Sequence, residues 1–483
     1  MRAAARLARL AGWGLALTLL LTGCFAKVQD LPRAATPAFA PVPEADPDLL
    51  VGLAISGGGS RAATFAAAVL EALARVRMPD GAGGERSVLE RVQYMSSVSG
   101  GSLATGYFAA RKPPRAQPVL GPGPDGLSPA YEDFFREYKA AMQENFEWAA
   151  AWRQLAFFRA FNPTKAAFSF SEVWDARFFH DMTFEQLYAR ERAGDSPRVI
   201  LNGTSYNTGR RVALTTLPAS DFDYDFVKRL LDDLVARSPR VNPEGMKIIR
   251  QNLQEAKTQF LPLTLDQLGA DHRGLHLSLA VASSASFPPA VGPVTYAVGG
   301  EPPYQHVGDG GLFDNLGTES LTTLFLKKIP KGSPKRGLII VIDSAFPFDA
   351  NAAVLDNNPR GYQVFKKDPS RIVGIMEERA NAYQLMLWDA LRTEGVALPD
   401  FASLRVEVLQ HTEPDWGTYQ DLPEECRGEF DANVTAKAIK DTVSEIPTLF
   451  RISKCHGALM IKAAEKVVEK HRARIVEFLE RPR

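Results

Sequence analysis

Cysteine and histidine are scarce in this sequence, with three and seven copies among 483 residues. No Cys-x-x-Cys or His-Glu-x-x-His pattern is present. His272 and His276 have the i,i+4 spacing of paired helical ligands, but Gly274 stands between them and a strand-like run follows. We therefore expect no metal site, and the low cysteine content excludes a small disulfide-rich scaffold.

An excess of charge of one sign is also missing, because Lys+Arg and Asp+Glu both total 56. Nucleic-acid-binding proteins usually have an excess of basic residues that neutralise the phosphates, so nucleic-acid binding is not expected here. The hydrophobic content of 45% and the aromatic content of 10% are those of a folded protein and exclude a disordered or collagen-like chain. The length is compatible with up to three domains or with one large α/β domain that carries insertions.

The N-terminal apolar run is too short to cross a membrane. Residues 10–21 form a run of 12, whereas a helix that spans a bilayer needs about 20 residues. Arg2, Arg6 and Arg9 precede this run, and no acidic residue accompanies them. A basic start followed by a short apolar stretch predicts that residues 1–23 are a secretory signal peptide.

The end of this signal predicts a lipid anchor. Residues 21–24 read Leu-Thr-Gly-Cys and resemble the lipobox of bacterial lipoproteins, which implies that Cys24 is lipidated and becomes the first mature residue. Phe25 follows, whereas an aspartate there usually marks retention in the inner membrane, so we expect anchoring in the outer membrane of the cell envelope. Residues 24–47, proline-rich and without periodicity, are expected to form a flexible tether.

Two cysteines remain after the anchor, Cys426 and Cys455. In an oxidising envelope compartment they can pair, and closing a loop of about 30 residues stabilises a fold by roughly 3–4 kcal/mol. Two free buried thiols are an equally supported alternative.

The first strand-like run leads into a glycine-rich turn. Residues 49–55 predict a buried strand, Gly57, Gly58 and Gly59 follow, and a helical pattern begins near Arg61. Glycines at a strand-to-helix turn let backbone N–H groups point at one spot, and the helix N-terminus adds positive charge there. The GxGxxG and P-loop patterns are not met. The turn is therefore suited to an anion or a developing oxyanion.

A nucleophile candidate lies on the next strand–turn–helix unit. Residues 92–95 predict a short strand, and Ser99 follows on a turn with Ser97 before it and Gly100 and Gly101 after it. A serine held in a strained turn needs small neighbours two residues away, which is the requirement of a nucleophile elbow. The pattern is S-x-S-x-G rather than G-x-S-x-G, and serine is small enough for the turn to survive.

A base candidate lies far downstream, where Asp309 precedes Gly310 and Gly311. A carboxylate on a glycine-flanked turn can approach a hydroxyl directly and take its proton. An ordinary turn is the simpler interpretation of this segment alone. A Ser-His-Asp triad is a further alternative and requires His306, the histidine nearest to this turn in the sequence.

Together these segments resemble the patatin-like phospholipase family, whose members are serine acyl hydrolases with a Ser–Asp dyad. Residues 57–61 look like the family's oxyanion loop, 97–101 like its elbow and 309–311 like its base motif, in the family's order. Residues 282–288 and 314–315 are also similar to family segments. The resemblance covers roughly residues 48–345.

The resemblance implies a role for each matched position. Ser99 is the nucleophile and Asp309 the base of the dyad. The oxyanion hole falls on the backbone N–H groups of Gly57, Gly58 and Gly59. No metal or other cofactor is implied.

Arg61 supplies charge support to the loop or contacts a lipid phosphate, unless it is a structural cation of the first helical turn. Three positions depart from the family pattern: Ala62 and Ser97 replace glycines, and Gly317 stands where proline is common. The first two substitutes are small, so they bear on fine geometry more than on chemistry.

The family fold is a three-layer α/β/α sandwich with a mostly parallel central sheet, and the sequence agrees. Strand-like runs alternate with helical patterns and cover residues 49–55, 92–95, 198–202, 210–215, 276–281 and 337–343. We assign residues 48–345 to this domain, with helical insertions at 112–195 and 221–270. Residues 346–483 are expected to form an extension packed on the core.

The sequence thus predicts a membrane-anchored serine acyl hydrolase that cleaves carboxylic esters of lipids, of phospholipase A or lysophospholipase type, through an acyl-enzyme. The expected partners are the lipid substrate and the membrane. The alternative is a non-catalytic envelope lipoprotein that uses the same fold as a binding or assembly platform.

Overall fold

A computed structural model describes residues 27–480 except 82, 124–125, 157–158, 160–161, 289, 330–332, most of 225–260 and, apart from 382, residues 346–402. At its centre is a ten-stranded sheet with the order β1-β9-β10-β6-β5-β2-β11-β12, in which β7 and β8 continue from β6. Its strands are β1 (Val28–Leu31), β2 (Leu49–Ile55), β5 (Tyr94–Val98), β6 (Arg198–Ser205), β7 (Arg211–Thr215), β8 (Leu263–Thr264), β9 (Val294–Val298), β10 (Glu301–Asp309), β11 (Arg336–Asp343) and β12 (Leu404–Gln410).

The centre of the sheet is parallel, because β6, β5, β2, β11 and β12 each run in the direction of their neighbour. The pairs of β10 with β6 and with β9, and of β7 with β6, are antiparallel. Every residue of β2 is buried, as expected for a parallel strand covered on both faces. A separate hairpin consists of β3 (Arg77–Pro79) and β4 (Glu85–Ser87).

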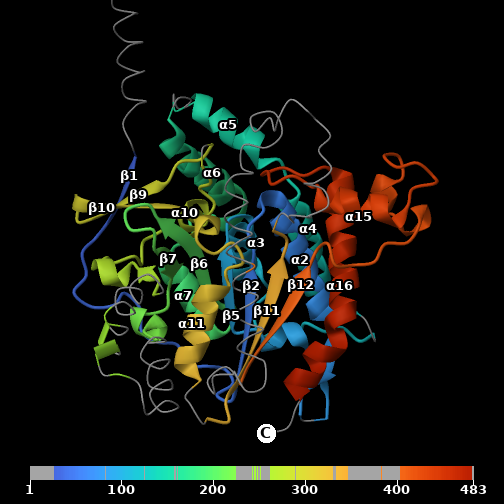
Figure 1. Cartoon of the computed structure of the whole chain (residues 1–483), viewed down its shortest axis with the longest axis horizontal. Helices are drawn as coiled ribbons and strands as arrows, with labels where there is room; N and C mark the ends of the chain where they lie inside the picture. Colours follow the sequence, from blue (N-terminus) through green and yellow to red (C-terminus); the bar gives the residue numbers. More distant parts are fainter. Residues whose placement is uncertain are drawn as a thin grey trace, which may run out of the picture.

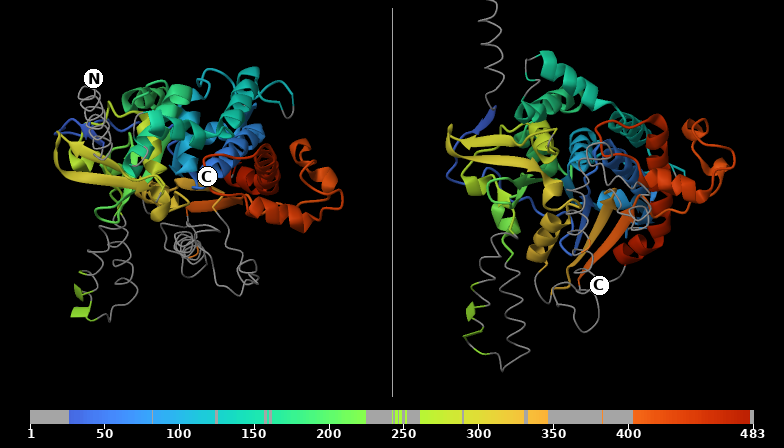
Figure 2. Two further views of the ribbon diagram at one scale, coloured as in Figure 1. Left: turned by 90° about the horizontal axis from the view of Figure 1, so that it is seen from above. Right: turned by 45° about the horizontal axis from the view of Figure 1, so that its top comes forward.

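Helices cover both faces of the sheet (Figure 1; Figure 2). Alternate residues of a strand point to opposite faces, and in β2 Leu53 joins one core while Leu50 joins the other. The second core contains α11 (Thr318–Lys328). The first contains α2 (Gly59–Arg75), α3 (Gly100–Arg111), α4 (Pro129–Met142), α5 (Phe146–Ala156), α6 (Ala166–Trp174), α7 (Phe184–Ala193), α10 (Leu277–Ser284), α15 (Ala436–Ser444) and α16 (Lys454–Glu480).

The predicted three-layer α/β/α sandwich with a mostly parallel sheet is therefore confirmed. Among the helices that the structure describes, none combines the length and the apolar character needed to cross a bilayer.

One strand expectation, that for residues 276–281, is wrong, because residues 277–281 lie in the helix α10 and His276 is its N-cap. All eight residues of α10 are buried. A short apolar run has no polar face that would reveal its period, so helix and strand cannot be told apart from its sequence.

The expectation of a flexible tether over residues 24–47 needs correction for the residues from 27 onward. Residues of β1 pair in parallel with β9 and extend the central sheet. Leu31 and Phe39 are buried in the core, and Glu44 forms an ion pair with Lys328 at 3.0 Å. This segment is held in place by single buried apolar side chains and by pairing with the edge strand of the sheet. Neither kind of contact produces a periodic pattern in the sequence. Cys24 and the signal peptide lie outside the described residues.

The first expected insertion, 112–195, folds into α4 to α7. Most of its aromatic side chains are buried. The second, 221–270, lies largely outside the described residues. The C-terminal part contributes β12, which extends the same sheet beside β11, and α16, which packs along α2. Residues 346–402 of the expected extension, apart from residue 382, lie outside the described residues.

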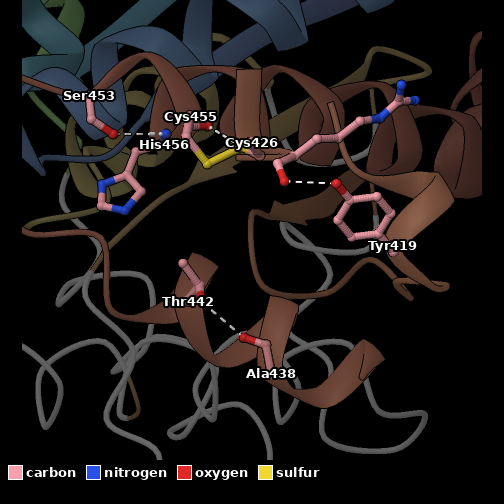
Figure 3. The surroundings of a disulfide bond; sticks show 8 residues. Tyr419, Cys426, Ala438, Thr442, Ser453, Cys455 and His456 are labelled. Atoms are coloured by element: carbon pink, nitrogen blue, oxygen red, sulfur yellow. Dashed lines mark hydrogen bonds between the residues drawn. A yellow bond between two sulfur atoms is a disulfide. The ribbon is translucent and has the colours of Figure 1, made fainter. Parts of the chain in front are cut away.

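Of the two alternatives for the remaining cysteines, the structure has the disulfide between Cys426 and Cys455 (Figure 3). Both residues are fully buried. Cys455 lies in the first turn of α16, and Cys426 ends a short 3-10 helix 29 residues earlier. The bond therefore fastens the loop between β12 and α15 to the helix that packs along α2.

Replacing both Cys426 and Cys455 with alanine is expected to lower the free energy of unfolding by about 2–4 kcal/mol, because the open chain gains conformational entropy when it unfolds. Urea unfolding followed by circular dichroism, with and without dithiothreitol, measures the effect. The reductant should destabilise the wild type and leave the double variant unchanged. An equal response of the two proteins to dithiothreitol would contradict the assignment.

Candidate active site

Two strands that run toward each other along one edge of β6 create the site. Val98, the last residue of β5, pairs with Asn202, and Asp309, the last residue of β10, pairs with the adjacent Gly203. Because β7 pairs with both Asn202 and Gly203, β5 and β10 must share the other edge of β6. Ser99, the residue after β5, is thereby brought next to the end of β10.

Ser99 occupies a strained turn. Its φ of 53° and ψ of −121° lie where non-glycine residues are rare, and holding such a conformation costs about 1–3 kcal/mol. The Ser99 N–H donates to the backbone oxygen and to Oγ of Ser284, at 3.2 and 3.1 Å. A Cβ on Gly100 would lie 2.0 Å from the carbonyl oxygen of Gly59. Small neighbours are therefore required, as the elbow pattern predicts.

Ser97, which replaces the first elbow glycine, is accommodated by a buried chain of hydroxyls. Its Oγ lies 3.1 Å from Oγ of Ser102, and Ser102 Oγ lies 2.8 Å from Oγ of Ser284. Ser284 Oγ in turn donates to the carbonyl oxygen of Asn202 at 2.5 Å. This network joins the turn to α10 and β6, so the extra hydroxyl has hydrogen-bonding partners in the interior.

Asp309 is a buried carboxylate at the turn after β10. Its side chain is 1% exposed, and Oδ1 accepts the Gly311 N–H at 2.8 Å. Burial raises the pKa of Asp309 to about 7, against the lowering effects of the Gly311 N–H and of a hydrogen bond from Ser99. Among the described residues, Oδ2 accepts no hydrogen bond of standard geometry. Oδ2 is thus the oxygen left to accept a hydrogen bond from the Ser99 hydroxyl.

The glycine turn, Gly57 to Gly59, packs against Ser99. A Cβ on Gly57 would lie 3.3 Å from Cβ of Ser99. Gly58 and Gly59 have φ values of 138° and 60°, a conformation that favours glycine. Their N–H groups, at the N-terminus of α2, donate to no acceptor in the described part of the chain. They are the free donors that an oxyanion requires.

The expectation that Gly57 contributes its N–H to an oxyanion hole needs correction, since this N–H donates to the carbonyl oxygen of Asn315 at 2.9 Å. It is not available to an oxyanion, and the role of Gly57 is close approach to Ser99. Gly100 follows Ser99 and begins α3, so its N–H is a further candidate donor, which the sequence analysis did not name. The signal for it was its position directly after an elbow serine.

Arg61 lies in the interior, with 1% of its surface exposed. Its Nε donates to the carbonyl oxygen of Ser344 at 2.9 Å, and Nη1 donates to that of Ile446. A Cβ on Gly58 would lie 2.9 Å from Nη2. This placement favours the structural role of Arg61, which fixes the glycine turn against the C-terminal part of the chain.

The C-terminal part closes over the glycine turn, a contribution that no motif in the sequence indicated. The carbonyl oxygen of Leu449 accepts the N–H of Ser60 at 2.7 Å. A Cβ on Gly59 would lie 2.3 Å from that same oxygen. Tyr206 is a second missed neighbour: its ring lies against Gly308, and burial together with the charge of Asp309 raises its pKa.

His306 points away from the site. It lies three residues before Asp309 on β10, and residues an odd number apart on a strand face opposite sides. Its Nδ1 lies 2.9 Å from Oγ1 of Thr295 on β9. The geometry therefore favours the carboxylate over this histidine as the base for Ser99.

One group of three potential metal ligands occurs among the described residues, Asp175, Asp181 and His276. Asp181 and His276 are exposed, and the group includes none of the residues around Ser99. His272 is a core residue instead, with Nε2 at 3.0 Å from the carbonyl oxygen of Thr215.

A protein-family model described as patatin-like phospholipase matches residues 53–322, more than half of the chain. Human GIVD cytosolic phospholipase A2 is a similar solved structure, with 11% identity and a TM-score of 0.44 over 90% of this chain and 60% of that one. The same enzyme in complex with methyl gamma-linolenyl fluorophosphonate gives 13% and 0.40 over 91% and 60%. The chain thus spans about 60% of the length of these structures. No match was found among the curated proteins.

Replacing Asp309 with asparagine is expected to stabilise the fold at pH 8. The raised pKa of Asp309 means that the unfolded chain ionises first as pH rises, so the carboxylate destabilises the native state increasingly between about pH 4 and 7 and fully above pH 7. Asparagine carries no such cost. Urea unfolding should show a gain of about 1–4 kcal/mol at pH 8 and little change at pH 4.

Asp133→Asn is the matched control, because the Asp133 side chain is 61% exposed. It should leave the pH dependence of stability as in the wild type. If Asp309→Asn destabilises the protein equally at both pH values, the buried carboxylate is not costly and its pKa is not raised.

Proposed function

The chain belongs to the patatin-like phospholipase family, and from this premise we propose that it is a lipid acyl hydrolase that cleaves carboxylic esters through Ser99 and Asp309. Phospholipase A or lysophospholipase activity is the reaction type that we assign. The observation that supports the proposal is that β5 and β10 run toward each other along β6, so that the strained Ser99 follows one strand and the buried Asp309 ends the other. The glycine turn after β2 lies against Ser99.

The first chemical step is attack on the ester carbonyl. Asp309 Oδ2 takes the proton of Ser99 while Ser99 Oγ bonds to the carbonyl carbon, and the carbonyl oxygen becomes negatively charged. The N–H groups of Gly58 and Gly59 hold that oxyanion, with the N-termini of α2 and α3 adding positive potential. Each such hydrogen bond typically changes the rate by about 10²–10³.

The oxyanion then collapses and the ester C–O bond breaks. Asp309 returns its proton to the leaving alcohol oxygen, so the free alcohol departs and the acyl group remains on Ser99 Oγ. Water completes the cycle in the same way: Asp309 takes a proton from water as the hydroxide adds to the acyl carbon, and Ser99 leaves with the proton restored. The two products are a fatty acid and an alcohol. Where a diacyl phospholipid is cleaved, the alcohol is a lysophospholipid.

Membrane attachment through a lipidated Cys24 remains part of the proposal, with the outer membrane of the cell envelope as the site of anchoring. The sequence at residues 21–24 supports it, and a lipid substrate makes a membrane location useful. The non-catalytic alternative rests on the altered elbow and on the large insertions. The first of these grounds is weakened, because Ser97 fits into the hydroxyl network around the turn.

Ser99→Ala and Asp309→Asn are each expected to lower kcat/KM on a phospholipid and lysophospholipid panel by at least about 10³-fold, since each removes a reacting group. Ser97→Ala is the matched control, a buried serine two residues away that should keep near-native turnover. A fluorescent fluorophosphonate should label the wild type and Ser97→Ala and leave Ser99→Ala unlabelled. Near-native turnover by Ser99→Ala would refute the dyad.

The activity is expected to rise with pH and level off above about pH 7, because Asp309 must be ionised to accept the Ser99 proton and its pKa is raised to about 7. Below that value kcat/KM should fall about tenfold per pH unit. His306→Ala should leave both the rate and this profile intact. A profile that disappears in His306→Ala would assign the base to the histidine instead.

A further inference from the structure

Helix α5 presents an apolar face to solvent. Trp148, Ala151, Trp152 and Leu155 stand at positions i, i+3, i+4 and i+7, which lie on one side of a helix. The side chains of the two tryptophans and the leucine are 65%, 57% and 59% exposed. Phe146, on the opposite side, is buried. The helix is thus apolar on both sides, and its outer side is covered by no described residue.

The outer side of α5 has the composition of a membrane-interface surface. The rings of Trp148 and Trp152 meet edge to face with their centroids 5.7 Å apart, so they form one patch rather than two scattered contacts. Tryptophan is enriched where a protein meets the boundary between lipid headgroups and acyl chains. Helices that lie in that boundary bury an apolar side and keep basic residues at its edge.

A basic edge is present beside this patch. Arg153 of α5 and Lys27 lie 3.4 and 3.8 Å from the carboxylate of Glu172. The side chains of these two cations remain 35% and 45% exposed. Solvent-accessible positive side chains therefore border the apolar face, and an anionic lipid surface complements them.

The N-terminal end of the described chain lies on the same side. Lys27, the first described residue, has its Nζ 4.3 Å above the ring of Phe168 in α6, and α6 packs against α5. Figure 1 shows α5, α6 and β1 toward one end of the molecule. Cys24 is three residues earlier, and three residues span at most about 11 Å. A lipid on Cys24 would therefore enter the bilayer close to the apolar face of α5.

The same helix is tied to the glycine turn of the active site. The N–H of Phe146 donates to the carbonyl oxygen of Phe450 at 2.9 Å, and the N–H of Phe450 donates to Glu147 at 3.0 Å. The preceding residue, Leu449, accepts the N–H of Ser60 in the turn. Contact of α5 with a bilayer would therefore place the oxyanion donors at a defined position relative to the lipid.

We propose that the face formed by Trp148, Ala151, Trp152 and Leu155 docks into the interface of an anionic lipid bilayer and presents the active site to membrane lipids. The inference rests on the proposed function, because it assumes that the bilayer that holds the anchor also supplies the lipid substrate. Beyond that function, the inference identifies which face of the protein contacts the bilayer and which residues form that face.

The test uses the purified full chain reconstituted in phosphatidylglycerol–phosphatidylcholine vesicles that contain a brominated phospholipid. The brominated lipid should quench wild-type tryptophan fluorescence, and the triple variant Trp148→Ala/Trp152→Ala/Leu155→Ala should lose most of this quenching. The variant should also hydrolyse vesicle lipid at least about 10-fold more slowly, while turnover of a water-soluble ester stays unchanged. Tyr304→Ala, which alters an exposed aromatic on β10, should behave as the wild type.

Equal quenching, or equal hydrolysis of vesicle lipid, in the wild type and the triple variant would overturn the docking proposal. So would self-association of the wild type that shields Trp148 and Trp152 from an aqueous quencher in the absence of vesicles, because a second copy would then cover the face. If wild-type quenching is present but the soluble ester is not cleaved, docking is supported and the Ser99–Asp309 chemistry fails. The two proposals can therefore be separated.

Discussion

A carboxylate held in the interior beside a strained serine is the constraint on which the site depends. Asp309 is the last residue of β10, Ser99 follows the last residue of β5, and the two strands point at each other along β6. Burial makes ionised Asp309 a costly group for the fold and raises its pKa to about 7, which suits the role of base that we propose for it at neutral pH. The large parallel sheet with its two cores supplies the stability that offsets this local cost.

The C-terminal part of the chain completes the site from outside the region with recognisable motifs. Leu449 accepts a hydrogen bond from the glycine turn, and Ile446 accepts one from Arg61. The disulfide between Cys426 and Cys455 fastens the start of α16, which packs along α2 behind the turn. The C-terminal part, which the sequence indicates only as an extension, thus holds the glycine turn in place, and through Phe450 it also contacts the start of α5.

The features that the sequence predicted well are those encoded within a few neighbouring residues. Three glycines between a strand and a helix, a serine among small residues and an aspartate before two glycines each define a local backbone geometry. The failures concern features that local patterns do not record: residues 277–281 belong to a fully buried helix without a polar face, and β1 pairs with β9, a strand far along the chain. Likewise, the loss of Gly57 as a donor depends on Asn315, far along the chain. No periodic pattern records such contacts.

Titration of the Asp309 carboxyl group tests the central claim most directly. The ¹³C carboxyl resonance of Asp309, identified by its absence in Asp309→Asn, can be followed against pH in the wild type and in Ser99→Ala. The account predicts a pKa near 7 in the wild type and a higher value in Ser99→Ala, because a hydrogen bond from Ser99 stabilises the ionised form. A pKa close to the ordinary value of 3.8, unchanged by the loss of Ser99, would show that the two side chains do not form a buried dyad.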